Sequence, residues 1–491
     1  MDDQPETLNA SLDENAVSDF FSQGFAMGVS TPEMEMKLRE ILEYHRKIFL
    51  GDENAAPAPA RGVVCDLDVG NVWPVAQRAR QIATHLLVKV YELLKKLLET
   101  GLIEHSESEW ASPIVIGLKK NGVDIKMCID YRVVNKFIKL SRYPLPLIDD
   151  LLIGFESAMW FMSVDMASGF WAVLMTERAK LISGFICPFG HFQWIRMPFG
   201  LKNAPLIYQA VINNCLWGFV RLPPEEEALV DRDVLEFLEL DQPEPDRTCR
   251  NIPARSPMGP VLGRSSYIDD IAHGAPTWDQ LCDDLNALLF RLRYWNISVR
   301  LPKGEFDKLA IPYLSHEISA EGIRATPKMA KSVQGLPFPS MLKGVQSFLG
   351  SLNYYNKFIE DLPAFEILKR KIVSTPLLRH PDRTKQFIII PHANPSAACA
   401  VLGQMHDGVI QPVRFTDRIL NEFELRIHIA EKELMAILRV LELFRPLIDG
   451  SESPVIIYTR YSVLKWLLNW NSIERRCLKW GLELSRWSLE I

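Results

Sequence analysis

The chain has 491 residues, which is too long for one hydrophobic core and predicts about three domains of roughly 150 residues each. A hydrophobic share of 48% and a charged share of 24% argue against a disordered chain and are typical of folded globular proteins. The net charge of −6 differs from the basic character of most nucleic-acid-binding proteins. Ten acidic residues and four arginines between positions 221 and 250 account for this deficit, so the remainder of the chain can still form a basic groove.

The cysteines give no sign of a metal site or of disulfides. None of the eight forms a Cys-x-x-Cys pair or has a histidine at zinc-ligand spacing. They indicate a reducing, intracellular compartment, which leaves cytoplasm and nucleus open. The N-terminal residues are acidic without an apolar segment, and no stretch approaches the ~18 apolar residues of a membrane span. We therefore expect neither secretion nor membrane insertion.

The N-terminal part of the chain predicts helices. A short helix is expected over 32–49, followed by a loose Ala/Pro tract over 55–60. Between Ile82 and Gly101, leucine and valine recur at helical spacing, which predicts an amphipathic packing helix. The glycine fits the position that follows a helix end.

A β-hairpin is predicted around Asn121-Gly122, a dipeptide that favours a two-residue turn. Lys119 lies on the arm before this turn and Lys126 on the arm after it. Lysines on such a hairpin are ordinarily solvated charges, so these residues alone give no function.

Two adjacent carboxylates, Asp269 and Asp270, lie between apolar residues in the stretch Ser266–Ala272. At a strand-turn-strand tip, successive side chains point to opposite faces, so only one of the two can point straight into a shared site. Asp165 ends an apolar, strand-like run 104 residues earlier and can supply a second acid. Carboxylates so arranged suit a pair of divalent cations. The alternative is that these acids are solvated turn residues.

Two longer stretches narrow the interpretation. The chain reads FICPFGHFQWIRMPFGLKNAPLIYQ from Phe185 to Gln209 and KKNGVDIKMCIDYR from Lys119 to Arg132. Together with Tyr-Ile-Asp-Asp at 267–270, these segments resemble the reverse transcriptase of gypsy-type LTR retrotransposons. The resemblance implies an α+β fold, a right-hand polymerase with fingers, palm and thumb, followed by a truncated RNase H-like α/β domain.

The resemblance also divides the chain. We expect an N-terminal helix and linker over 1–60, fingers and palm over 61–310 with an acidic insertion at about 217–264, thumb and connection over 311–382, and the RNase H-like domain over 383–491. Charge runs such as that of the insertion are ordinarily solvated, so we expect an exposed segment there. Several short helices are expected in the thumb.

The implied site belongs to a two-metal polymerase. Asp165, Asp269 and Asp270 would hold two Mg²⁺ ions about 4 Å apart, with Mn²⁺ as the alternative. Phe170 would exclude a 2′-hydroxyl and so select deoxynucleotides; otherwise it is an ordinary core aromatic. The other implied nucleotide contacts are Lys119, Lys126, Phe199, Gly200 and Gln209. The implied partners are an RNA or DNA template with its primer, and dNTPs.

Lys126 stands where the family usually has arginine, so it keeps the charge but loses the planar fork that clamps phosphate. In the RNase H-like segment, Glu433 matches one carboxylate of a two-metal site. His392 and Arg460 stand where the family has aspartates, and the final acid would lie beyond Ile491. A cation at position 460 opposes metal binding by like charge, so we expect this domain to be inactive.

The sequence therefore predicts an RNA-directed DNA polymerase of a retrotransposon. The alternative is a degenerate retroelement remnant that keeps the fold, and with it nucleic-acid binding, but has lost turnover. The unmatched RNase H acids and the acidic insertion favour the alternative. The three polymerase acids and Phe170 favour the enzyme.

Overall fold

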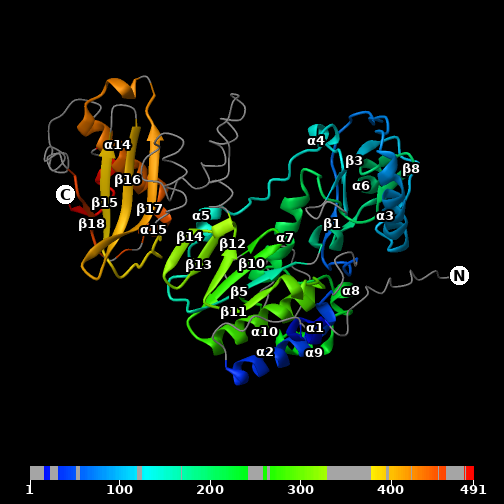
Figure 1. Cartoon of the computed structure of the whole chain (residues 1–491), viewed down its shortest axis with the longest axis horizontal. Coiled ribbons are helices and arrows are strands. Elements are labelled where there is room, and N and C mark those ends of the chain that lie inside the picture. Colours follow the sequence, from blue (N-terminus) through cyan, green and yellow to red (C-terminus); the bar gives the residue numbers. More distant parts are fainter. Residues whose placement is uncertain are drawn as a thin grey trace, which may run out of the picture. The chain divides into compact units, whose positions relative to one another are not determined.

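The computed structural model describes residues 16–22, 31–50, 56–118, 124–166, 168–240, 258–262, 266–328, 377–393, 397–421, 423–449, 451, 453–459, 480 and 483–490. The chain forms two compact units (Figure 1). Unit 1 comprises Met1–Leu147 and Phe161–Lys308, and unit 2 comprises Ile148–Trp160 and Leu309–Ile491. None of the described helices combines the length and the apolar character needed to cross a membrane.

The first sheet of unit 1 has five strands in the order β2-β8-β7-β3-β4. Their bounds are Ile103–His105 (β2), Gly190–Trp194 (β8), Phe185–Cys187 (β7), Ser112–Leu118 (β3) and Ile125–Ile129 (β4). Strands β3 and β4 are antiparallel with Lys126 opposite Gly117, which confirms the predicted hairpin pairing. The turn itself, with Lys119, lies outside the described residues.

Helix α3 (Leu87–Glu99) confirms the predicted amphipathic helix. It buries Val90, Leu94 and Leu97, which lie on one face at spacings of four and three residues. The helix begins later than predicted because a short 3-10 turn precedes it. It ends before Gly101, whose φ of 63° is a left-handed conformation that glycine adopts without strain.

The second sheet of unit 1 carries the predicted acidic residues. Its four strands lie in the order β11-β5-β10-β9, with bounds Glu305–Lys308, Trp160–Asp165, Asp270–Ala275 and Ser266–Tyr267. Helix α10 (Trp278–Trp295) packs against β10 and against helix α7 (Ala204–Trp217), and α7 also packs against β9. The central position of β5 and β10 places the ends of both strands side by side (Figure 1).

Shorter elements complete unit 1. They are α1 (Ala16–Ser22), α2 (Pro32–Tyr44), β1 (Val64–Cys65), α4 (Val134–Phe137), β6 (Leu174–Met175), α6 (Glu177–Ile182), α8 (Pro224–Glu227) and α9 (Arg232–Phe237).

Helix α2 is part of unit 1 and is joined to α10 by polar contacts. Lys37 Nζ lies 2.7 Å from Asp279 Oδ1, and His45 Nε2 lies 2.8 Å from Asn286 Oδ1. Burial lowers the pKa of His45 to about 4, so its ring is neutral at pH 7. The segment boundaries expected at positions 60, 310 and 382 stay predictions.

The first part of the insertion expected at 217–264 is folded, although many of its residues are exposed. Helices α8 and α9 fold there, and α9 packs against α10. Arg293 of α10 has a side chain only 6% exposed and forms ion pairs with Asp231 at 2.8 Å and with Asp233 at 2.7 Å. Part of the acidic run thus neutralises a buried arginine, a pairing that a charge count cannot reveal. Residues 241–257 lie outside the described part.

In unit 2 a five-stranded sheet has the order β17-β16-β15-β18-β19. The bounds are Val409–Ile419, Ala397–His406, Phe387–Ala393, Val455–Ile457 and Leu489–Glu490. Strands β15, β18 and β19 are parallel, and β15, β16 and β17 are antiparallel. Helix α14 (Ile429–Leu443) packs against this sheet, and α15 (Arg445–Ile448) follows it.

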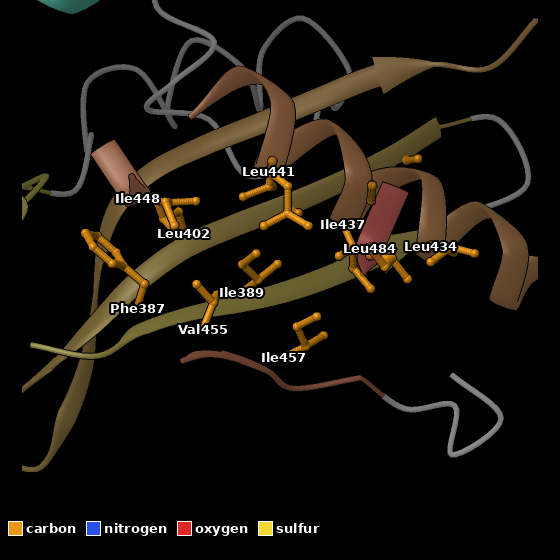
Figure 2. Packing of buried hydrophobic residues seen from close by; sticks show 14 of the residues in the cluster. Phe387, Ile389, Leu402, Leu434, Ile437, Leu441, Ile448, Val455, Ile457 and Leu484 are labelled. Atoms are coloured by element: carbon orange, nitrogen blue, oxygen red, sulfur yellow. The ribbon is translucent and has the colours of Figure 1, made fainter. Parts of the chain in front are cut away.

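The core of this sheet forms beneath α14. Figure 2 shows Ile437 and Leu441 of α14 facing Ile389 and Leu402 of the sheet. All four are buried, with exposed fractions of 1% or less. The helical spacing of the first pair and the alternation along the strands explain why the sequence predicted an α/β unit here.

A three-stranded antiparallel sheet, also in unit 2, has the order β12-β13-β14. Its bounds are Ala310–Tyr313, His316–Ser319 and Gly322–Ala325, and the short helix α5 (Ile148–Leu151) belongs to the same unit. The helices predicted for the thumb lie outside the described residues, because 329–376 are not described.

Candidate active site

Backbone hydrogen bonds join the two acidic segments. Asp165 is the last residue of β5, and Met166 N donates to Asp269 O at 2.9 Å. Arg300 N donates to Asp165 O at 3.0 Å on another side. Main-chain atoms, which are independent of side-chain type, therefore bring together segments more than a hundred residues apart.

The acidic turn is held from below by Gln209 of α7. Ile268, at the tip between β9 and β10, has a φ of 56°, which is strained for a β-branched residue. Gln209 Oε1 accepts from Ile268 N at 2.7 Å, and its Nε2 donates to Ser266 Oγ at 3.2 Å. The glutamine side chain thus stabilises the conformation that presents Asp269.

Gln209 was expected to contact the nucleotide or template, and the structure places it elsewhere. Its exposed fraction is 0%, and its amide is engaged with the turn and with Asn213. Glutamine in a segment resembling a binding motif suggested a ligand contact, but burial assigns it a positioning role.

A cavity of about 140 Å³ opens beside the acids. Four residues predicted from the sequence line it together: Asp165, Phe170, Phe199 and Asp269. The other lining residues are Met166, Ser168, Gly169, Arg300 and Lys303. The volume is below that of most small-molecule pockets, so the cavity suits ions and one end of a larger substrate.

The remaining predicted contacts do not line this cavity. Asp270 is the first residue of β10 and is not among the lining residues, and Lys126 is exposed on β4. Gly200 has a φ of 93°, and its carbonyl accepts from Asn135 Nδ2 at 2.9 Å. Their roles, and that of Lys119, stay predictions. Arg300 was not predicted, because no local pattern connects an isolated arginine to acids on other strands.

The carboxylates repel one another. Burial, then the negative charges of Asp269 and Asp165, raise the pKa of Asp270 to about 6. Burial also raises the pKa of Asp165, although Lys303 Nζ, 3.5 Å from its Oδ2, acts in the opposite direction. A site that is this rich in negative charge is stabilised by a bound cation.

The donor set fits a hard divalent ion. Carboxylate oxygens are the ligands that Mg²⁺ prefers, and such sites commonly use one or two carboxylates with water and substrate phosphate. Among the described residues no group of three or more His, Cys, Asp and Glu side chains forms a metal cluster. Asp165 and Asp269 are therefore the two protein ligands that the cavity offers, and other ligands would come from solvent or substrate.

A larger cavity, of about 660 Å³, lies in unit 2. Its lining includes three carboxylates and three permanently charged cations: Glu156, Glu321, Asp382, Arg379, Arg383 and Lys385. Because the positive and negative side chains are equal in number, the lining favours neither an anionic nor a cationic ligand. Only the smaller cavity gathers the predicted acids.

The RNase H-like site is only partly within the described residues. Glu433 on α14 is 2% exposed and accepts a hydrogen bond from Thr459 Oγ1 at 2.8 Å. His392 lies on β15 opposite Cys399. Arg460 lies outside the described residues. The predicted loss of catalysis in this domain stays a prediction.

Two family models match the chain. Residues 118–222 match reverse transcriptase (RNA-dependent DNA polymerase), and residues 382–487 match the RNase H-like domain found in reverse transcriptase. The chain carries a reverse transcriptase domain followed by an RNase H-like domain. The acidic turn that carries Asp269 lies outside the first matched region, which ends at residue 222. The acidic segment lies between that region and the turn.

Curated relatives of the chain include retrotransposon polyproteins. It is 27% identical to the retrovirus-related Pol polyprotein from transposon 297 of Drosophila melanogaster, covering 99% of this chain and 44% of that protein. It is 25% identical to the transposon Tf2-3 polyprotein of Schizosaccharomyces pombe, covering 80% of this chain and 28% of that protein. The chain therefore spans less than half the length of these relatives.

Solved structures confirm the fold class predicted from the sequence. The foamy viral protease-reverse transcriptase in complex with dsDNA matches with a TM-score of 0.74 and 19% identity, covering 96% of both chains. The same kind of protein in complex with an RNA/DNA hybrid matches with a TM-score of 0.71 and 20% identity, covering 96% of this chain and 62% of that one. The chain thus has the mixed α and β fold of these solved proteins.

Proposed function

We propose that the chain is the RNA-directed DNA polymerase of a gypsy-type LTR retrotransposon, which extends a primer on an RNA or DNA template with dNTPs. The observation that carries the proposal is that Asp165, at the end of β5, and Asp269, in the turn between β9 and β10, line one cavity with Phe170 and Lys303. Solvated turn acids would show neither a shared cavity nor the burial that raises the pKa of Asp165 and of the neighbouring Asp270. The nucleic-acid complexes of the foamy viral enzymes support the choice of partners.

In this proposal Asp165 and Asp269 hold two Mg²⁺ ions, or Mn²⁺ in their place, with the charge of Asp270 beside them. When bound, such ions lower the pKa of the primer 3′-hydroxyl and neutralise charge on the triphosphate. Lys303 and Arg300 add fixed positive charge at the cavity for the departing phosphates.

The remaining side chains position the nucleotide. Phe170 presents its ring in the cavity and excludes a 2′-hydroxyl, and Phe199, 5.0 Å from it between ring centroids, forms the adjoining wall. Gly200 lets the backbone approach the nucleotide closely. Lys126, with Lys119 on the same hairpin, supplies further charge to the phosphates. Such positioning accounts for much of the rate in phosphoryl transfer.

The test is extension of oligo(dT) on poly(rA) with dTTP and Mg²⁺. We expect the wild-type protein to extend the primer and Asp269→Asn to lose at least about 10³-fold in rate, because a charge that holds the ions is removed. Asp279→Asn is the matched control, since Asp279 is exposed on α10 and, within the described part of the chain, forms an ion pair with Lys37. A wild-type protein that adds no nucleotide under these conditions contradicts the proposal.

The alternative function is nucleic-acid binding by a remnant without turnover. His392, at a position where the resemblance expects an aspartate, favours loss of at least one activity. Filter binding of labelled primer-template separates the two functions. Tight binding together with extension that equals the Asp269→Asn background supports the alternative.

A further inference from the structure

The ring of Tyr208 lies directly beneath the loop that carries Phe170. A Cβ atom added to Gly169 would lie 2.3 Å from Tyr208 Cζ and 2.4 Å from its hydroxyl oxygen. Real Cβ atoms do not approach other atoms so closely, so only glycine fits above this ring. The loop therefore rests on Tyr208 with no space between them.

Hydrogen bonds within the loop hold it in a tight turn. Ser168 has a φ of 47°, and Trp171 N donates to Ser168 O at 2.8 Å to close a 3-10 turn over Gly169–Ala172. Val173 N donates to Phe170 O at 3.2 Å at the other end of the turn. Because the turn keeps its shape, a contact from α7 below it sets the distance between the turn and α7.

Phe170 has one fixed neighbour and one exposed neighbour. Tyr208 contacts it edge to face, with centroids 5.7 Å apart and planes at 81°, and Tyr208 is 0% exposed. Phe199 contacts it from the other side, but Phe199 is 52% exposed. A fully buried ring held by packing on all sides is the more rigid support.

Tyr208 is held by its fit rather than by a polar bond. Among the described residues its hydroxyl has no hydrogen-bond partner, although it is fully buried. A phenylalanine-sized ring would fill the same slot less completely. The extra oxygen occupies the place left open by the missing side chain of Gly169.

We propose that Tyr208 is a positioning residue that, through Gly169, sets how far Phe170 projects toward the sugar of the incoming nucleotide, and so determines the selection of deoxynucleotides over ribonucleotides. This inference rests on the proposed polymerase function and adds a residue outside the cavity to its specificity. Tyr208 touches no substrate, because it lies beneath the loop and does not line the cavity.

The test compares kcat/KM for dGTP with that for GTP on poly(rC) primed with oligo(dG). This ratio is unaffected by the fraction of protein that is folded. Tyr208→Leu should lower the ratio about tenfold, since lost contacts in a pocket change discrimination by about 10- to 200-fold. Phe170→Ala should lower it at least as much. The double variant should match Phe170→Ala alone, because Tyr208 acts through Phe170.

A rescue experiment tests the contact through Gly169. Gly169→Ala should lower kcat/KM for dGTP about 100-fold, because the added methyl group meets the Tyr208 ring. In the double variant, Tyr208→Leu makes room for the added methyl group. Its kcat/KM for dGTP should therefore be at least about tenfold higher than that of Gly169→Ala alone. A loss that the second substitution does not reverse contradicts the proposed contact.

Tyr294→Phe is the control for general destabilisation. Tyr294 is another buried tyrosine, on α10, and it does not line the cavity. Its hydroxyl donates to Glu227 Oε1 at 2.7 Å. Its replacement should leave the dGTP/GTP ratio unchanged. Extension by the wild-type protein with an unchanged ratio in Tyr208→Leu overturns the role of Tyr208 alone. Absence of wild-type extension overturns the polymerase proposal on which it depends.

Discussion

Individual side chains around the acidic turn divide into those that face the cavity and those that hold it in shape. Asp165, Asp269 and Phe170 face it, whereas Gln209 and Tyr208 are fully buried beneath it. Both groups occur in segments that resemble the same enzyme family. Residue type therefore does not distinguish them, because a buried amide and a substrate-binding amide use the same hydrogen-bonding groups.

The pH dependence of thermal stability tests whether the pKa of Asp270 is raised in the folded chain. The pKa of Asp270 rises from an ordinary value of 3.8 to about 6 in the folded chain, so the folded state binds this proton more tightly than the unfolded state. This group therefore stabilises the fold below about pH 4, and that contribution is lost as the pH rises through 6. Asp270→Asn should raise the melting temperature of the metal-free protein more at pH 7 than at pH 4.

Thermal unfolding in EDTA at the two pH values measures this difference. Asp279→Asn, at an exposed position, is the control for removing a carboxylate. An equal effect of Asp270→Asn at both pH values would show that the pKa of Asp270 is not raised in the folded chain. The affinity of the protein for Mg²⁺ should fall below about pH 6, because protonated carboxylates are poor ligands.

At the scale of elements, α10 and α9 show how an acidic segment becomes structural. The Arg293 guanidinium, 2.7 Å from Asp233, holds the pKa of Asp233 below its ordinary value even though burial acts in the opposite direction. Arginine carries five donors in a rigid fork, so one side chain can bind two carboxylates. The short helix α9 depends on this pairing, since six residues alone do not form a stable helix in water.

Arg293→Met should lower the free energy of unfolding by about 2–3 kcal/mol, because it leaves Asp231 and Asp233 without their shared partner in a partly buried site. The matched control is Arg232→Ala on α9 itself. Arg232 is 91% exposed and pairs with Glu236 within the helix, so its loss should cost less than about 0.5 kcal/mol.

Urea unfolding of both variants measures the difference. Equal midpoints would show that α9 is not held by Arg293. The expected loss should appear without a change in the dGTP/GTP ratio, since α9 does not line the cavity.

At the scale of the whole molecule, the described residues bring together more of the predicted polymerase site than of the predicted RNase H site. Asp165 and Asp269 line one cavity, whereas the described part of the RNase H-like domain has the sheet, the helix, the core and one matching carboxylate, Glu433. A fold survives the loss of a metal site because packing and catalysis use different residues.

The RNase H-like domain should therefore cleave no RNA. A 5′-labelled RNA annealed to DNA should remain intact with Mg²⁺ under conditions in which the same protein extends a primer. Glu433→Gln should change nothing in this assay, because a single carboxylate holds no metal pair. Cleavage by the wild-type protein that Glu433→Gln abolishes would show that the domain is active.

The amino-acid order was sufficient for features that repeat locally. Local sequence patterns predicted the helix around Val90, the hairpin arms of β3 and β4, and the strands of the RNase H-like sheet. Segments that resemble a known family pointed to Asp165 and Asp269 as candidate site residues. Such patterns lie within a few residues of one another, and local physics determines them.

Three-dimensional packing alone decided the rest. Only folding brought Arg300 to the acids, placed Gln209 and Tyr208 beneath the cavity, and paired Asp231 with Arg293. Each is a contact between segments distant in the chain, and the energy of such a contact depends on burial and geometry that no single segment contains.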